Sequence, residues 1–247
     1  MNIIVSDIDE LIVSLIELPV LVNLRCTNKY FYQLVSNQAI IKQWLIIKQW
    51  LIIKSTRGKK STREIFVKAC MKGFLSYAMF LLNEDKIDIH ACEDAFRESC
   101  RNGHIEIARW LIQLGKSEEY KKINIHAYDE EAFRLSCAKG HIEIAHWLIQ
   151  LGESEGYRKI NIHAYGEQAF RCSCENGHIE IARWLIQLGE SEEYKKINIH
   201  AYDEEAFRLS CANDHIETAH WLIQLGESGG YDSIDQSIID VYIYLML

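Results

Sequence analysis

Residues 103–115 read Gly-His-Ile-Glu-Ile-Ala-Arg-Trp-Leu-Ile-Gln-Leu-Gly, and the same stretch returns at 140–152 and 177–189 with at most one change. A degraded copy follows at 214–226, and successive copies begin 37 residues apart. A unit of this length cannot bury its own apolar face, so it gains a hydrophobic core only by stacking on its neighbours. We therefore expect a solenoid whose function depends on its surface and not on an active-site pocket.

Each unit contains two helical patterns separated by a glycine. Gly140 ends the first pattern, since glycine adopts the left-handed conformation of a helix stop without Cβ strain. We expect Asp129 to cap the start of that helix and Glu130 to pair with Arg134 one turn later. The second pattern places four apolar residues on one face: Ile144, Ala145, Leu148 and Ile149. The unit is therefore predicted to be a two-helix hairpin, followed by a polar finger such as residues 152–159.

The second half of the unit resembles the ankyrin repeat, whose pattern is Gly-His-x-Glu-Val-Val-x-x-Leu-Leu-x-x-Gly. Residues 140–152 fit this pattern, but residues 131–134 read Glu-Ala-Phe-Arg in place of Thr-Pro-Leu-His. The period is 37 residues, where about 33 is usual. The resemblance covers residues 62–232, about five repeats of which the first and last are degenerate. It implies an all-α ankyrin-repeat solenoid of helix-turn-helix units with projecting fingers, which acts in protein-protein interaction.

The composition narrows the class of protein further. A net charge of −8 opposes affinity for nucleic acid or an anionic membrane, because both require clustered lysine and arginine. The N-terminus has no basic region ahead of its apolar stretch, and no apolar run reaches the length that spans a bilayer. We expect an intracellular protein. Long, proline-poor repeats are similar to those of giant DNA viruses, which implies a viral protein acting in the host cytoplasm.

Residues 1–54 fall outside the repeat and are predicted to form a helical N-terminal module. Residues 8–35 are similar to an F-box, with an apolar helix, a turn and a second apolar segment. This resemblance implies a substrate adaptor that docks on a subunit of a cullin-type ubiquitin ligase. The residues it assigns to that contact are Leu18, Pro19, Leu21 and Leu24. The alternative is a plain ankyrin scaffold in which this segment only caps the first repeat.

Two short segments complete the domain organisation. Residues 55–61 read as a basic linker between the N-terminal module and the repeats. Residues 233–247 read as a truncated C-terminal half-repeat, where a sixth first helix begins. We expect a monomer, with self-association through the apolar stretch 238–247 as the alternative.

The cysteines and histidines of the repeats do not predict a metal site. Four cysteines recur at one point of the unit, where a small buried residue suits packing: Cys100, Cys137, Cys174 and Cys211. Each lies four residues before a repeat histidine, which gives two ligands per unit, whereas zinc needs four that converge. The chain also lacks a phosphate-binding loop and the usual hydrolase motifs. We therefore expect reduced thiols, no cofactor, no metal and no catalytic residue.

Two series of aromatic residues are candidates for binding a protein. The first occupies a variable position of the ankyrin pattern: Trp110, Trp147, Trp184 and Trp221. The second lies in the fingers: Tyr120, Tyr157 and Tyr194. Tryptophan is a frequent anchor at protein interfaces, but packing between adjacent repeats is the alternative for the first series. For the second series, the alternative is that these tyrosines are solvated loop residues with no role in binding.

Overall fold

The computed structural model describes residues 61–84, 87–117, 120–154, 156–227 and 230–246. The chain divides into two units, residues 1–57 and 58–247, and every described residue belongs to the second. The N-terminal module at 1–54, with Leu18, Pro19, Leu21 and Leu24, therefore lies outside the described residues. In the described part, the secondary structure consists of eleven helices and contains no strand.

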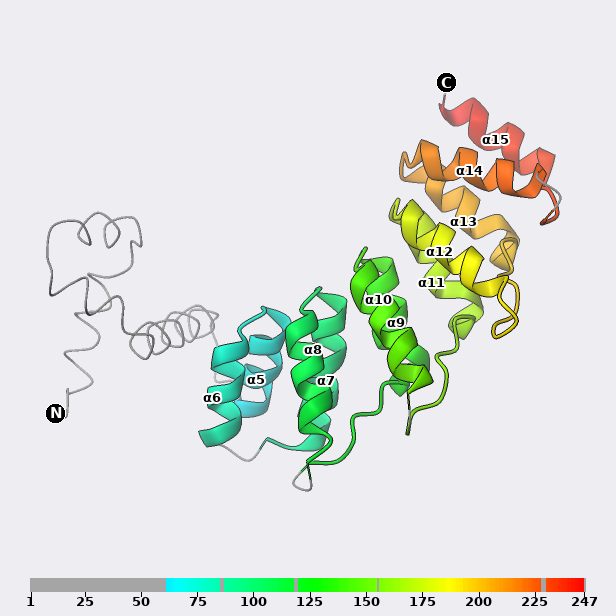
Figure 1. The fold of residues 1–247 in the computed structure, drawn as a ribbon. Coiled ribbons are helices and arrows are strands. Elements are labelled where there is room, and N and C mark those ends of the chain that lie inside the picture. Colours follow the sequence, from blue (N-terminus) through cyan, green and yellow to red (C-terminus); the bar gives the residue numbers. More distant parts are fainter. Residues whose placement is uncertain (1–60, 85–86, 118–119, 155, 228–229, 247) are drawn as a thin grey trace, which may run out of the picture. The chain divides into compact units, whose positions relative to one another are not determined.

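The helices form hairpins that follow one another along the chain (Figure 1). The first helices are α5 Thr62–Met71, α7 Ile89–Arg101, α9 Ala127–Ala138, α11 Ala164–Glu175, α13 Ala201–Ala212 and α15 Gln236–Met246. The second helices are α6 Leu75–Glu84, α8 Ile105–Leu114, α10 Ile142–Glu153, α12 Ile179–Gly189 and α14 Ile216–Glu227. Each first helix packs on the second helix of its own hairpin, where one follows, and on the first helix of the next. The predicted stack of helical hairpins is confirmed.

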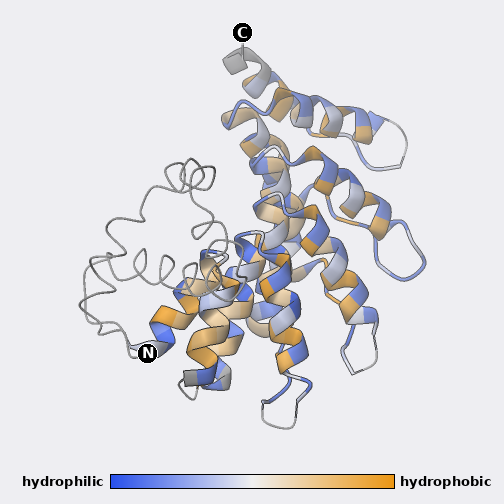
Figure 2. Cartoon of the chain, turned by 60° about the vertical axis from the view of Figure 1, so that its left-hand side comes forward, coloured by the Kyte–Doolittle hydropathy of each residue, from blue (hydrophilic) through white to orange (hydrophobic). Residues whose placement is uncertain are grey.

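The core repeats the same residues in every hairpin. One phenylalanine from each of the first helices α5 to α13 is at most 1% exposed: Phe66, Phe96, Phe133, Phe170 and Phe207. In Figure 2, hydrophobic residues recur along the helices, while the connections between hairpins are mainly hydrophilic. The cysteine next to this core is also buried, and burial raises the pKa of the Cys137 thiol. It packs as a small neutral residue, in agreement with the predicted role in packing.

A contact between histidine and glycine joins each hairpin to the preceding one. His141 Nε2 donates to the carbonyl oxygen of Arg101 at 3.0 Å, and His104 Nε2 does the same to Met71 at 3.0 Å. The His141 ring lies over Gly103, where an added Cβ would come within 2.8 Å of the ring atom Cε1. Gly103 also has a φ of +82°. Glycine is thus required twice, by the backbone conformation and by the approach of the ring.

Burial lowers the pKa of His141 and of His178, and it outweighs the backbone hydrogen bond that each ring makes. The neutral imidazole therefore predominates at neutral pH, and it keeps the Nε2–H that the carbonyl accepts. Across the described residues, no helix is long and apolar enough to cross a membrane.

Replacing Gly140 by alanine tests this contact. Gly140 has a φ of +81°, and an added Cβ would lie 2.8 Å from the His178 ring atom Cε1. We expect the Gly140→Ala variant to lose at least about 1 kcal/mol of unfolding free energy, measured by urea denaturation. The control is Gly230→Ala, because no atom lies within 4 Å of a Cβ built there. Equal stability of the two variants would contradict the proposed constraint.

Candidate functional site

Three first helices begin with a left-handed turn, which the sequence pattern did not predict. In α9, Tyr128, Asp129 and Glu130 have φ values of 53°, 52° and 62°. The corresponding residues of α11 and α13 adopt the same conformation. A non-glycine residue there costs roughly 1–2 kcal/mol, so the surrounding contacts must hold the turn in place.

The turn accommodates one additional residue. Seven positions separate His126 from Phe133, whereas six separate His90 from Phe96 in the preceding repeat. Helix α7 begins directly after Asp88 and has a conventional N-cap, in which the Asp88 side chain accepts a hydrogen bond from the backbone amide of Ala91. The extra residue in the later repeats therefore appears as a left-handed turn at the start of the helix.

A buried carboxylate forms the base of each turn. Glu130 is 3% exposed, and its carboxylate lies 2.9 Å from Nδ1 of His126. The same carboxylate accepts from the backbone amide of Asn161 in the next finger, at 3.2 Å. Glu167 repeats both contacts with His163 and Asn198. Each buried glutamate thus joins its own turn to the following repeat.

Two expectations for this region are wrong. Glu130 does not pair with Arg134, because it precedes the right-handed part of the helix and pairs with His126 instead. Asp129 does not cap the helix, because it lies within the left-handed turn and the N-cap position falls on His126. Both expectations assumed a regular helix from residue 129 onward.

An arginine satisfies the carbonyl groups that the turn exposes. Arg134 donates from Nε to the Asp129 carbonyl at 2.7 Å and from Nη2 to the Tyr128 carbonyl at 2.8 Å. Its remaining Nη1 donates to the Gln168 side chain of the next repeat. The planar fork of the guanidinium allows all three contacts at once, which a lysine ammonium would not reproduce.

One arginine from each of α7, α9 and α11 also supports a tyrosine of the following repeat. The guanidinium carbon lies 4.3 Å from the ring centroid in every pair: Arg97 with Tyr128, Arg134 with Tyr165 and Arg171 with Tyr202. The three tyrosines, which we call the tyrosine ladder, are 68%, 59% and 61% exposed in chain order. One ring face is fixed by the cation, and most of the side chain remains open to solvent.

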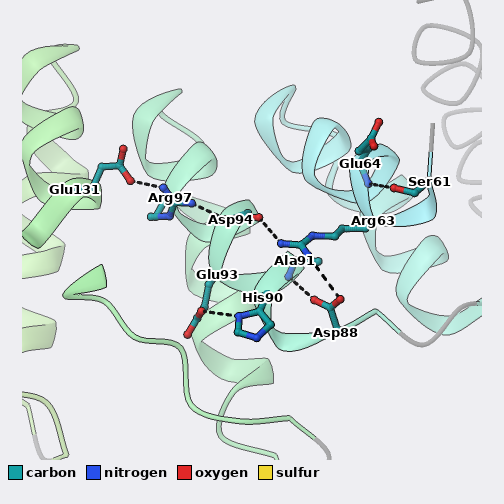
Figure 3. A network of polar contacts seen from close by, with 10 residues as sticks. All are labelled: Ser61, Arg63, Glu64, Asp88, His90, Ala91, Glu93, Asp94, Arg97 and Glu131. Carbon is teal, nitrogen blue, oxygen red and sulfur yellow. Dashed lines mark hydrogen bonds and ion pairs between the residues drawn. The ribbon is translucent and has the colours of Figure 1, made fainter. Parts of the chain in front are cut away.

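Ion pairs continue this row of contacts toward the first repeat (Figure 3). Arg63 donates to Asp94 at 2.8 Å, and Arg97 bridges Asp94 to Glu131 of the next repeat. Partial burial opposes ionisation of Asp94, but hydrogen bonds from the two arginines outweigh it and lower the pKa of this carboxyl. The charged groups on the first helices are therefore largely occupied with one another.

A hollow of about 420 Å³ lies beside the central tyrosine of the ladder. Its lining includes Tyr165, Arg158, Lys159, Asp129 and His163. The His163 Nε2 atom is buried and has no hydrogen-bond partner in the described structure. The hollow therefore combines an aromatic ring, two cations and the two carboxylates of Asp129 and Glu130, of which Glu130 is already paired with His126.

The tryptophans that are candidates for binding a protein pack between repeats. Each is only partly exposed, and its ring centroid lies 6.3–6.4 Å from a buried phenylalanine of the preceding repeat. The residues concerned are Trp110, Trp147, Trp184 and Trp221. Arg109 lies over the Trp147 ring, and His146 lies 4.4 Å from the Trp184 ring centroid. These contacts favour the packing alternative, although part of each indole still reaches the surface.

The finger tyrosines also pack between repeats. Tyr120, Tyr157 and Tyr194 are each half-buried. The Lys122 ammonium lies 3.5 Å from the Tyr157 ring centroid, so the preceding finger covers this ring. Burial, followed by nearby glutamates, raises the pKa of Tyr194 to about 12. The more exposed tyrosines are those of the ladder, and their signal in the sequence is the His-Ala-Tyr that recurs at 126–128, 163–165 and 200–202.

Comparison with known proteins gives a family match. A family model described as ankyrin repeats (3 copies) matches residues 99–195 and 133–233, which together cover more than half of the chain. No curated protein matches the chain. Among the described residues, no group of three or more histidine, cysteine, aspartate or glutamate side chains is arranged to hold a metal ion.

The strain in the left-handed turn is testable because one repeat already has glycine there. Gly166 occupies the position of Asp129 and has a φ of +58°. We expect Asp129→Gly to increase the free energy of unfolding by roughly 1 kcal/mol, since glycine tolerates this conformation. The reverse change, Gly166→Asp, is expected to decrease it, because the new Cβ would approach the Tyr202 ring within 2.6 Å. Urea denaturation measures both, and destabilisation by Asp129→Gly would contradict the assignment of strain.

Proposed function

The chain belongs to the ankyrin repeat family of protein-protein interaction modules, and we propose that it holds its target protein on the tyrosine ladder. The observation that carries this proposal is the exposure of Tyr128, Tyr165 and Tyr202 on a repeated arginine support. The family is an interaction scaffold, which agrees with a function in binding.

The ladder has the physical properties of a binding surface. Tyrosine provides a large contact area and loses little conformational freedom, so it is enriched at interfaces. Here the supporting guanidinium restricts each ring before a partner arrives, which reduces the entropy cost of binding further. The ladder also stands on strained backbone, and such strain is concentrated at functional sites.

Removing the ladder tests this proposal. We expect the combined variant Tyr128→Ser, Tyr165→Ser and Tyr202→Ser to lose at least tenfold in proximity labelling of the proteins that the unaltered chain labels. Each lost cation–π contact costs about 0.5–1 kcal/mol, so a thermal melt must show that the variant is folded. The control is Phe80→Ser, which removes an aromatic residue that is 42% exposed outside the ladder. An unchanged set of labelled proteins in the folded ladder variant would refute the proposal.

The N-terminal module has a proposed partner of its own. We propose that residues 1–54 bind the adaptor subunit of a cullin-type ubiquitin ligase, which makes the protein a substrate adaptor. The support is the F-box-like order of residues 8–35. We also propose a viral origin and action in the host cytoplasm, from the similarity to the long repeats of giant DNA viruses. The alternative is a plain scaffold with an N-terminal cap.

A pull-down distinguishes the adaptor from the plain scaffold. We expect the full chain to retain the ligase adaptor subunit, and the variant Leu18→Ala, Leu21→Ala and Leu24→Ala to lose it because apolar contacts are removed. The ladder variant serves as the control and should retain the subunit, since its changes lie in the repeats. Failure of the unaltered chain to retain the subunit would favour the scaffold.

A further inference from the structure

A row of unpaired cations accompanies the tyrosine ladder. Lys121, Arg158 and Lys195 are exposed and recur every 37 residues at the base of successive fingers. Their side chains make no hydrogen bond or ion pair with any residue that the structure describes. The cation that follows each one is occupied, as Lys122 covers the Tyr157 ring and Lys159 pairs with Glu193. The first cation of each pair is therefore free for a ligand.

The hollow beside Tyr165 shows how cation and tyrosine are combined. Arg158 and Tyr165 both line it, together with Asp129. The repeat places Cys92 and Gly166 at the position of Asp129 in the neighbouring units. The other carboxylate of the lining, Glu130, recurs as Glu93 and Glu167, but each of these glutamates pairs with a histidine of its own unit. The unpaired charge that all three units share is therefore a cation. Charge complementarity favours a partner with one acidic side chain per repeat.

The spacing of the repeats limits the conformation of such a partner. The first helices α7, α9, α11 and α13 pack directly on one another, and packed helices lie about 8–10 Å apart. A β-strand returns to the same face every two residues, or about 6.6 Å. A polyproline II helix returns every three residues, or about 9.3 Å. Of these two extended conformations, only polyproline II presents the same face once per repeat.

We propose that the tyrosine ladder binds an acidic, proline-containing segment of a partner protein in the polyproline II conformation, with one turn per repeat. A proline ring packs on each tyrosine, as in other aromatic-lined grooves that recognise polyproline II. A carboxylate in each turn pairs with Lys121, Arg158 or Lys195. This inference rests on the proposed function of the ladder and adds the chemistry of the target segment.

Binding of synthetic peptides to the full chain tests the proposal by fluorescence anisotropy. The probe is a labelled peptide of four Pro-Glu-Ala triplets. We expect it to bind, and we expect at least tenfold weaker binding of two others: one with lysine for glutamate, and one of identical composition with the triplet period scrambled. Tyr165→Ser and Arg158→Gln should each weaken binding of the first peptide at least threefold. Lys139→Gln is the matched charge control, because Lys139 is exposed at the opposite end of α9 and should leave binding unchanged.

The outcomes separate this inference from the proposed function. Equal binding of the scrambled peptide, absence of binding by the Pro-Glu-Ala peptide, or an equal effect of Lys139→Gln and Arg158→Gln would overturn the polyproline II assignment. If the ladder variant nevertheless loses its labelled proteins, the ladder binds a target of different chemistry and only the present inference fails. Preferred binding of the lysine peptide would likewise overturn the assignment of an acidic partner.

Discussion

The contact between the histidine of one repeat and the glycine of the preceding repeat is the constraint on which the rest of the structure depends. The His141 ring occupies the space that a side chain at Gly103 would need, and its Nε2 donates to the Arg101 carbonyl at 3.0 Å. A steric limit and a directional bond together fix how one hairpin sits on the next. The other contacts between repeats, such as Arg134 with Gln168, need that register.

The same arginines connect the stability of the array to its surface. Arg134 binds the carbonyl groups of its own left-handed turn, contacts the side chain of Gln168 and lies beneath the Tyr165 ring. The buried Glu130 supports the turn from the other side, through His126 and the amide of Asn161. The free energy spent on an unfavourable backbone is thus offset by contacts that extend into the next repeat. The strained turn and the arginine beneath the ring together hold the tyrosine in a position exposed to solvent.

Sequence reasoning succeeded where a residue's role depends on its place in the repeat. The 37-residue period and the positions of Gly140 and Leu148 predict two helices, a glycine stop and a buried apolar face, and the structure has all three. The prediction of a regular helix is wrong at residues 128–130, where the φ values are positive. The acidic residues there look like ordinary helix-start residues, because local pattern alone does not reveal that Glu130 is buried and pairs with a histidine.

The sequence by itself determined the architecture, because a short unit repeated nearly unchanged can bury its apolar face only against its own copies. It also determined that residues which the copies share recur on the surface with the same 37-residue period. Only the tertiary structure decided which aromatic residues face solvent, since that depends on contacts across repeats. Trp147 is covered by Phe96, and Tyr157 by Lys122, while Tyr165 rests on Arg134 with its outer side open. These partners lie more than 30 residues away in sequence, beyond the reach of any local pattern.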